Sequence, residues 1–157
     1  MTDMVQTISD TLLAELQSIL HENIPLTRCM GLKVMECNGK GLLLSAPLEP
    51  NINHAATAFG GSLSSAATLA CWGMLWLMLK QRDRSACIMV QESNISFVRP
   101  VTRDFIAQCY YPSEAALDRL LQMYDNMGRG RIEMQSEIYE RSQPCVGFTG
   151  KFVLLPE

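Results

Sequence analysis

The sequence predicts an α+β fold in which a curved, mainly antiparallel sheet wraps around one long buried helix. The segment 60–80 is strongly apolar, and no formal charge lies between Glu49 and Lys80. About six segments of strand-like composition accompany it, and 157 residues suit a single domain over 1–157. A helix that is apolar on nearly every face must be covered by the rest of the chain, and an antiparallel sheet supplies that cover.

The chain opens with a predicted amphipathic helix over residues 7–23. Leucine and isoleucine side chains recur along one face of this segment, and Pro25 follows its end. Thr7 and Asp10 have the spacing of a capping box, so we expect the helix to begin at Thr7. The helix is expected to close one edge of the domain without taking part in chemistry.

Six strands are predicted where β-branched and aromatic residues dominate between turn signals. The turn signal Asn38-Gly39 joins the first two, and Arg99-Pro100 ends the third. A shorter helix, over 113–126, is expected between the fourth and fifth strands, with Ser113 as its N-cap and Gly128 and Gly130 closing it. The predicted strands cover residues 31–37, 41–47, 86–98, 104–111, 131–141 and 145–155.

Composition excludes several classes of function. A net charge of −3 leaves no basic face for nucleic acid. The purely apolar part of the central helix, Leu69–Leu79, is shorter than the roughly 20 residues of a membrane span, so we expect a buried core helix. The start of the chain, Met1–Met4, lacks the basic and apolar regions of a signal peptide, which predicts a cytoplasmic protein.

The cysteines and histidines do not have the spacing of a metal site. Six cysteines are scattered without a Cys-x-x-Cys pair, and His21 and His54 are the only histidines. In a cytoplasmic chain such cysteines are expected to be small buried hydrophobic residues. We therefore expect no metal and no resident cofactor.

The functional site is predicted at the start of the central helix. A polar loop, residues 51–59, leads into Gly60-Gly61-Ser62, where the helix begins. The first turn of a helix has backbone N–H groups without intrahelical partners, and its positive dipole end attracts negative charge. Gly60 and Gly61 could instead allow only a close approach of the helix to a neighbour, but they stand where the free donors are.

The element order and this loop resemble the hot-dog fold, and specifically the thioesterase-like family of the YiiD C-terminal type. The residues that carry the resemblance are 53–62, the run Ala67–Trp76, and Ser96-Phe97-Val98-Arg99-Pro100. The likeness covers Ile24 to Leu155. It implies a sheet enclosing one long helix, activity on acyl thioesters, and at least a homodimer with sites at the subunit interface.

The resemblance also implies roles for individual residues. Asn53 matches the asparagine placed beside the thioester, and Gly60 and Gly61 match the pair that polarises its carbonyl. Phe59 stands where many relatives have histidine. The helix position that holds an Asp or Glu in hydrolytic relatives falls on Thr68. We therefore expect Asn53, Gly61, Ser62 and Thr68 to act in catalysis, and His54, Thr57, Phe59, Gly60, Ser65 and Arg99 to bind the substrate.

The missing helix carboxylate leaves the reaction open. Hydrolysis needs a group that activates water, and a hydroxyl such as that of Thr68 cannot act alone as a base. His54 is the one neutral-pH base nearby. Decarboxylation of a malonyl thioester needs no base, only a stabilised enolate oxygen and an uncharged pocket for the departing carboxylate. A module that binds acyl ligands without catalysis is the third alternative.

The expected partners follow from the same resemblance. The substrate would carry coenzyme A or the phosphopantetheine arm of an acyl carrier protein, as part of the substrate rather than as a cofactor. Arg99, Arg129, Arg131 and Lys151 could meet the phosphates of such an arm, although scattered surface charges are the commoner explanation. Trp72 and Trp76 are expected in the core or a subunit interface.

Overall fold

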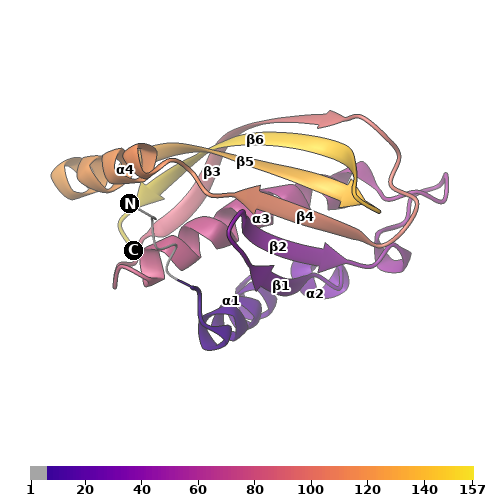
Figure 1. The fold of residues 1–157 in the computed structure, drawn as a ribbon, viewed down its shortest axis with the longest axis horizontal. Helices are drawn as coiled ribbons and strands as arrows, with labels where there is room; N and C mark the ends of the chain where they lie inside the picture. The colour runs from indigo at the N-terminus through magenta and orange to yellow at the C-terminus, as the bar shows by residue number, and fades with distance from the viewer. Residues whose placement is uncertain (1–6) are drawn as a thin grey trace.

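The computed structural model describes residues 7–157, which form a six-stranded antiparallel sheet with one long helix against one face (Figure 1). The strand order is β1-β2-β4-β5-β6-β3. This confirms the predicted α+β architecture, a curved sheet around a central helix. The strands are β1 (Lys33–Cys37), β2 (Gly41–Ala46), β3 (Cys87–Phe97), β4 (Phe105–Tyr110), β5 (Gly130–Glu140) and β6 (Gln143–Leu155).

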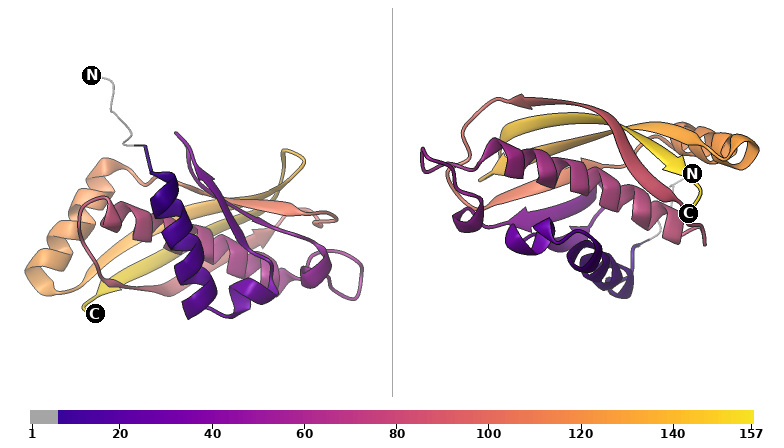
Figure 2. Two further views of the ribbon diagram at one scale, coloured as in Figure 1. Left: turned by 90° about the horizontal axis from the view of Figure 1, so that it is seen from below. Right: turned by 180° about the vertical axis from the view of Figure 1, so that it is seen from behind.

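The central helix, α3, spans Gly60–Lys80 as predicted and lies across the concave face of the sheet (Figure 2). By length and composition it is apolar enough to cross a membrane, but 72% of its most apolar window is buried inside the protein. That burial is typical of a core helix. Gly73 allows the close packing, because a Cβ there would lie 2.9 Å from the Leu42 side chain of β2.

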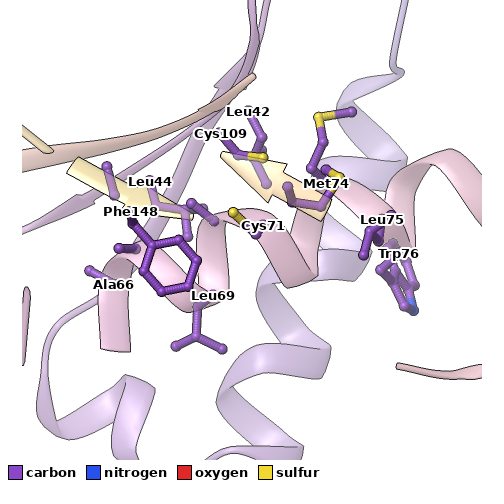
Figure 3. Packing of buried hydrophobic residues seen from close by; sticks show 14 of the residues in the cluster. Leu42, Leu44, Ala66, Leu69, Cys71, Met74, Leu75, Trp76, Cys109 and Phe148 are labelled. Carbon is purple, nitrogen blue, oxygen red and sulfur yellow. The ribbon is translucent and has the colours of Figure 1, made fainter. Parts of the chain in front are cut away.

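The core is built between α3 and the inner face of the sheet. Figure 3 shows Cys71 and Met74 of α3 among side chains of β2 and β4, with Cys109 close to Cys71. Trp76 is buried, while Trp72 is half-buried and its indole N–H donates to the Ile88 carbonyl oxygen at 3.0 Å. Burial in this core is the main stabilising contribution that the apolar helix makes.

The N-terminal helix α1 spans Asp10–Asn23, and the predicted start at Thr7 is wrong. Ser9 is the N-cap, and its hydroxyl oxygen accepts from the Leu12 backbone N–H at 3.2 Å. Ser9 has the extended backbone of a cap, so the helix begins one residue after it. The expectation about Met1–Met4 concerns residues outside the described part of the chain.

Two short elements lie outside the prediction. The helix α2 (Leu26–Cys29) follows Pro25, and the 3-10 helix η1 (Glu49–Asn51) opens the polar loop. Both are a single turn long, so neither produces a hydrophobic period that a sequence pattern could reveal. Both elements lie at the base of the loop that precedes α3.

The helix α4 (Glu114–Met127) confirms the second predicted helix. Ser113 caps it by accepting from the Ala116 N–H at 3.2 Å, and Gly128 ends it in the left-handed conformation with φ 65°. Gly130 does not cap the helix; it is the first residue of β5. A Cβ on Gly130 would lie 2.5 Å from the Leu120 carbonyl oxygen, so the glycine allows α4 to fold back onto the sheet.

The cysteines follow the prediction only in part. Cys71, Cys109 and Cys145 are buried, and Cys37 and Cys87 are half-buried. Cys29 is exposed, and the buried residue of α2 is Thr27. Burial raises the pKa of the Cys37 thiol, whose sulfur lies 3.2 Å from the Tyr111 hydroxyl.

Candidate functional site

The first turn of α3 presents free backbone donors. Phe59 is the N-cap residue but provides no side-chain cap, and the first helical hydrogen bond runs from the Leu63 N–H to the Phe59 oxygen at 3.1 Å. Within residues 7–157, the N–H groups of Gly60, Gly61 and Ser62 therefore have no acceptor. They form the positive end of a 21-residue helix whose only charged side chain is Lys80 at the opposite end.

Two exposed phenylalanine rings flank this turn. Phe59 is 57% exposed and Phe97, at the end of β3, is 54% exposed. A Cβ on Gly61 would lie 2.3 Å from the Phe59 ring, and one on Gly60 would lie 3.5 Å from the Phe97 ring. The glycine at 61 is therefore needed for the Phe59 ring to lie against the helix. The rings give the donor site apolar walls.

The loop before α3 is a small hairpin tied to the fold at its base. Ile52 and Ala58 form an antiparallel bridge, and the Ala58 N–H donates to the Val101 oxygen at 2.8 Å. Asn51 is 2% exposed, and its amide nitrogen donates to the carbonyl oxygens of Met30 and Pro47 at 2.8 and 2.7 Å. The entry to α3 is thus fixed by buried hydrogen bonds.

Asn53 builds the interior of this hairpin. Its side-chain oxygen accepts from the N–H groups of Ala55 and Thr57 at 2.9 and 3.1 Å, and its amide nitrogen donates to the Thr57 hydroxyl at 2.9 Å. Ala56 has φ 60°, a tight turn that these bonds hold in place. One amide N–H of Asn53 is left for a ligand, and His54 is exposed beside it.

Half-buried small and polar residues continue along one face of α3. Gly61, Ser65 and Thr68, followed by Trp72, recur every three or four residues and are half-buried, whereas most of the later helix is buried. The Ser65 hydroxyl donates to the Gly61 oxygen at 2.8 Å, and the Thr68 hydroxyl donates to the Ser64 oxygen at 2.8 Å. Both hydroxyls keep lone pairs free to accept a hydrogen bond from a ligand.

Most of the predicted site residues are gathered here. The loop residues Asn53, His54, Thr57 and Phe59 lead directly into the first turn of α3, and Ser62, Ser65 and Thr68 follow on the helix. Ser62 is half-buried in that turn. Arg99 is exposed just beyond Phe97, but its guanidinium donates to the Gln143 side chain at 2.6 Å.

The other basic residues lie elsewhere. Arg131 pairs with Val153 of β6, and Phe97 pairs with Val146 of the same strand. Val146 and Val153 are seven residues apart (153 − 146), about 23 Å along β6, so Arg131 lies far from Phe97 and the start of α3. Lys151 forms an ion pair with Glu92 at 3.0 Å. Neither supports a phosphate site next to α3.

Sequence reasoning did not assign Phe97 or Asn51 to the site. Phe97 belongs to the Ser96–Pro100 run that carries the resemblance, but its position over Gly60 depends on the pairing of β3 with β6. Asn51 could have been suspected from its place beside Pro50 at the head of the loop. Its burial depends on α2, which the sequence pattern did not reveal.

Comparison with known proteins identifies the family to which this fold belongs. Residues 13–156 match the family model described as "Putative thioesterase (yiiD_Cterm)". A protein of unknown function from Chlorobaculum tepidum TLS is similar in structure, with a TM-score of 0.89 and 33% identity over 94% of this chain and 96% of that one.

Two further solved structures are similar. One from Shewanella oneidensis, described as a "putative thioesterase", has a TM-score of 0.82 and 27% identity, covering 94% of this chain and all of the other. A Haemophilus influenzae thioesterase has a TM-score of 0.72 and shares the fold at 14% identity, covering 92% and 90% of the two chains. Since the family model spans nearly the whole sequence, this hot-dog chain belongs to the YiiD C-terminal thioesterase-like family.

Proposed function

We propose that the chain is an enzyme of the thioesterase superfamily that acts on acyl thioesters, with the thioester carbonyl oxygen bound at the start of α3. The supporting observation is the uncapped first turn, where three N–H groups at Gly60, Gly61 and Ser62 lack acceptors within residues 7–157. Donors preorganised for a developing oxyanion are typically worth about 3 kcal/mol each in transition-state stabilisation.

The surroundings of these donors suit the rest of a thioester. The rings of Phe59 and Phe97 would cover the apolar part of the acyl group, and the remaining amide N–H of Asn53 would reach a polar atom of the substrate. The hydroxyls of Ser62, Ser65 and Thr68 line the path along α3. Coenzyme A or a carrier-protein phosphopantetheine arm would enter as part of the substrate, and we expect the enzyme to work in the cytoplasm.

Hydrolysis is the first candidate reaction. Water attacks the carbonyl carbon, the C–S bond breaks, and the products are a carboxylic acid and a free thiol. The step needs a base, and α3 carries no carboxylate. His54, exposed on the neighbouring loop, or a residue of a second subunit would have to take the proton from water.

Decarboxylation of a malonyl thioester is the second candidate, and the neutral stripe on α3 favours it. The C–C bond to the carboxylate breaks, its electron pair forms the thioester enolate, CO2 leaves, and a proton from solvent completes the acetyl thioester. The α3 donors would stabilise the enolate oxygen. An Asp or Glu at Thr68 would repel the substrate carboxylate, so its absence suits this reaction.

We further propose that the enzyme is a homodimer joined through β3. This strand is at one edge of the sheet, is 11 residues long, and leaves Met89, Val90 and Phe97 exposed. A long edge strand with exposed apolar residues is a template for pairing with a second strand. The half-buried stripe of α3 and the Phe97 ring border the same edge, so a second copy would close the site.

Mass spectrometry of the purified chain with malonyl and plain acyl thioesters of coenzyme A and carrier protein tests the proposal. Acetyl thioester with the C–S bond intact identifies a decarboxylase, whereas free thiol identifies a hydrolase. Ser62→Ala should lower kcat, and Ser45→Ala on β2 is the matched control, which should not. Saturable binding without turnover of any substrate would make the chain an acyl-binding module and refute the enzyme.

A further inference from the structure

The face of the sheet turned away from α3 carries a hollow. Along β4, Phe105, Ala107 and Cys109 point into the core, so the alternate residues Ile106 and Gln108 face outward. The hollow has a volume of about 470 Å³, within the usual range for small-ligand sites. It lies over β2, β4 and the turn between β5 and β6.

Gln108 is the most buried residue of its lining. It is 8% exposed, and its side-chain amide nitrogen is buried without a hydrogen-bond partner among residues 7–157. It pairs with Leu43 of β2 and Glu137 of β5 across the sheet. A buried donor without an acceptor is destabilising and rare in folded proteins, so it calls for a partner that the chain itself does not supply.

Two tyrosines beside Gln108 are held by one carboxylate. The hydroxyl oxygens of Tyr110 and Tyr139 lie 2.7 Å apart, the Tyr110 hydroxyl donates to Glu137 at 3.2 Å, and the Tyr139 hydroxyl also donates to Glu137. Burial raises the pKa of the Tyr139 hydroxyl, and the bond to Glu137 raises it further. Both hydroxyls donate to Glu137, so the two rings are held in place and Glu137 is occupied by them.

The rim of the hollow is positively charged. Lys40 and Arg141 line it, and neither forms an ion pair with another residue of the described chain. Asp104 also lines it, but one of its carboxylate oxygens accepts from the Leu48 N–H at 2.9 Å. The side chains of Leu43 and Ile106 supply an apolar wall.

We propose that this hollow binds a small carboxylate with a compact apolar body, whose oxygen accepts from the buried amide of Gln108 while Lys40 and Arg141 balance its charge. The apolar body would lie against Leu43, Ile106 and the tyrosine rings. The site is on the opposite face of the sheet from α3, so it is separate from the thioester site and does not depend on the proposed reaction.

The test is a titration of the ¹⁵N-labelled full chain with benzoate, followed by NMR. We expect saturable shifts of the Gln108 side-chain amide and of the backbone amides at Gln108 and Tyr139, with Gly60 and Gly61 unmoved. Inorganic phosphate, run in parallel, should shift the same signals more weakly because it lacks an apolar body. Arg141→Ser should weaken benzoate binding about tenfold through loss of one charge-assisted contact.

Gln108→Leu separates a ligand role from a structural one. The leucine removes the unpartnered donor, so the melting temperature should stay the same or rise by a few degrees while benzoate binding disappears. Gln135→Leu, on the same face but outside this hollow, is the matched control and should bind benzoate normally.

Three results would overturn the proposal. The first is the lack of saturable shifts at millimolar benzoate. The second is equal binding by Gln108→Leu. The third is a concentration-dependent association, measured by sedimentation, that Gln108→Leu abolishes, since that would assign the face to contact between copies of the chain.

Discussion

At the scale of single residues, the loop before α3 depends on two asparagines with different tasks. Asn51 anchors the base of the loop to the carbonyl oxygens of Met30 and Pro47, and Asn53 shapes its tip through Ala55 and Thr57. The first is buried at the base of the loop, whereas the second borders the proposed substrate. Substitutions at the two positions should therefore be distinguishable by stability and by turnover.

Asn51→Ala should lower the free energy of unfolding by about 2–3 kcal/mol, because the buried Met30 oxygen and the part-buried Pro47 oxygen both lose their donor. Urea denaturation measures the change. Asn126→Ala, at an exposed position of α4, is the control and should stay within about 0.5 kcal/mol of the parent. A change at Asn51 no larger than at Asn126 would show that its two hydrogen bonds contribute nothing.

Asn53→Asp should keep the fold and lose activity. The carboxylate still accepts from the N–H groups of Ala55 and Thr57, so the melting temperature should stay within about 2 °C of the parent. A negative charge beside the developing oxyanion should reduce kcat/KM at least about tenfold, and more for a malonyl than for an acetyl thioester. Unchanged kcat/KM would place the carbonyl away from this loop.

At the scale of elements, helix ends and strand contacts decide how well the sequence predicts the structure. Both ends of α3 were predictable, because the glycine pair marks its start at Gly60 and a charged segment begins at Lys80. The start of α1 was misplaced because Thr7 and Ser9 both suit an N-cap, and only the backbone conformation distinguishes them. Single-turn elements such as α2 have no period to detect.

A pair of cap substitutions tests the revised start of α1. Ser9→Ala should lower the free energy of unfolding by about 1 kcal/mol, since it removes the acceptor of the Leu12 N–H. Thr7→Ala should have an effect below about 0.5 kcal/mol because Thr7 is exposed and outside the helix. Thermal unfolding of both variants in parallel measures the difference. A larger loss of stability in Thr7→Ala than in Ser9→Ala would show that Thr7 is the N-cap.

The contact between α4 and β5 gives a second element-scale prediction. Gly130→Ala places a Cβ 2.5 Å from the Leu120 carbonyl oxygen, so α4 must shift, at a cost of about 1–3 kcal/mol in unfolding free energy. Gly147→Ala in β6 is the control, since no atom lies within 4 Å of its Cβ, and it should be neutral or slightly stabilising. Equal denaturation midpoints for the two would contradict the contact.

At the scale of the whole molecule, the sequence predicted the helix and the sheet but not which distant residues the strand order makes neighbours. An apolar helix and alternating strands suffice to predict a sheet around α3. The strand order, which places β3 at an edge and Phe97 over Gly60, depends on pairings between residues far apart in the chain. The hollow at Gln108 was not foreseen for the same reason, since its residues come from β2, β4 and the β5–β6 turn.

The two edges of the sheet allow a matched test of the proposed dimer. Met89→Lys on β3 should convert the protein to a monomer and reduce turnover, because a buried lysine at the interface is costly. Met35→Lys on β1, at the opposite edge and similarly exposed, should leave both unchanged. Sedimentation velocity measures the mass, and a Met89→Lys dimer with full activity would exclude assembly through β3.

The internal hydrogen bonds of the hairpin before α3 affect the conformational entropy that the loop loses when a ligand binds. The N–H groups of Asn53, Ala55, Ala56, Thr57 and Ala58 all have acceptors within the chain, and His54 is the exception among residues 53–58. The shape of the hairpin is therefore set by its own hydrogen bonds, so binding should cost little conformational entropy. Amide hydrogen exchange in the ligand-free protein should accordingly be slow throughout the hairpin and fast at His54 alone.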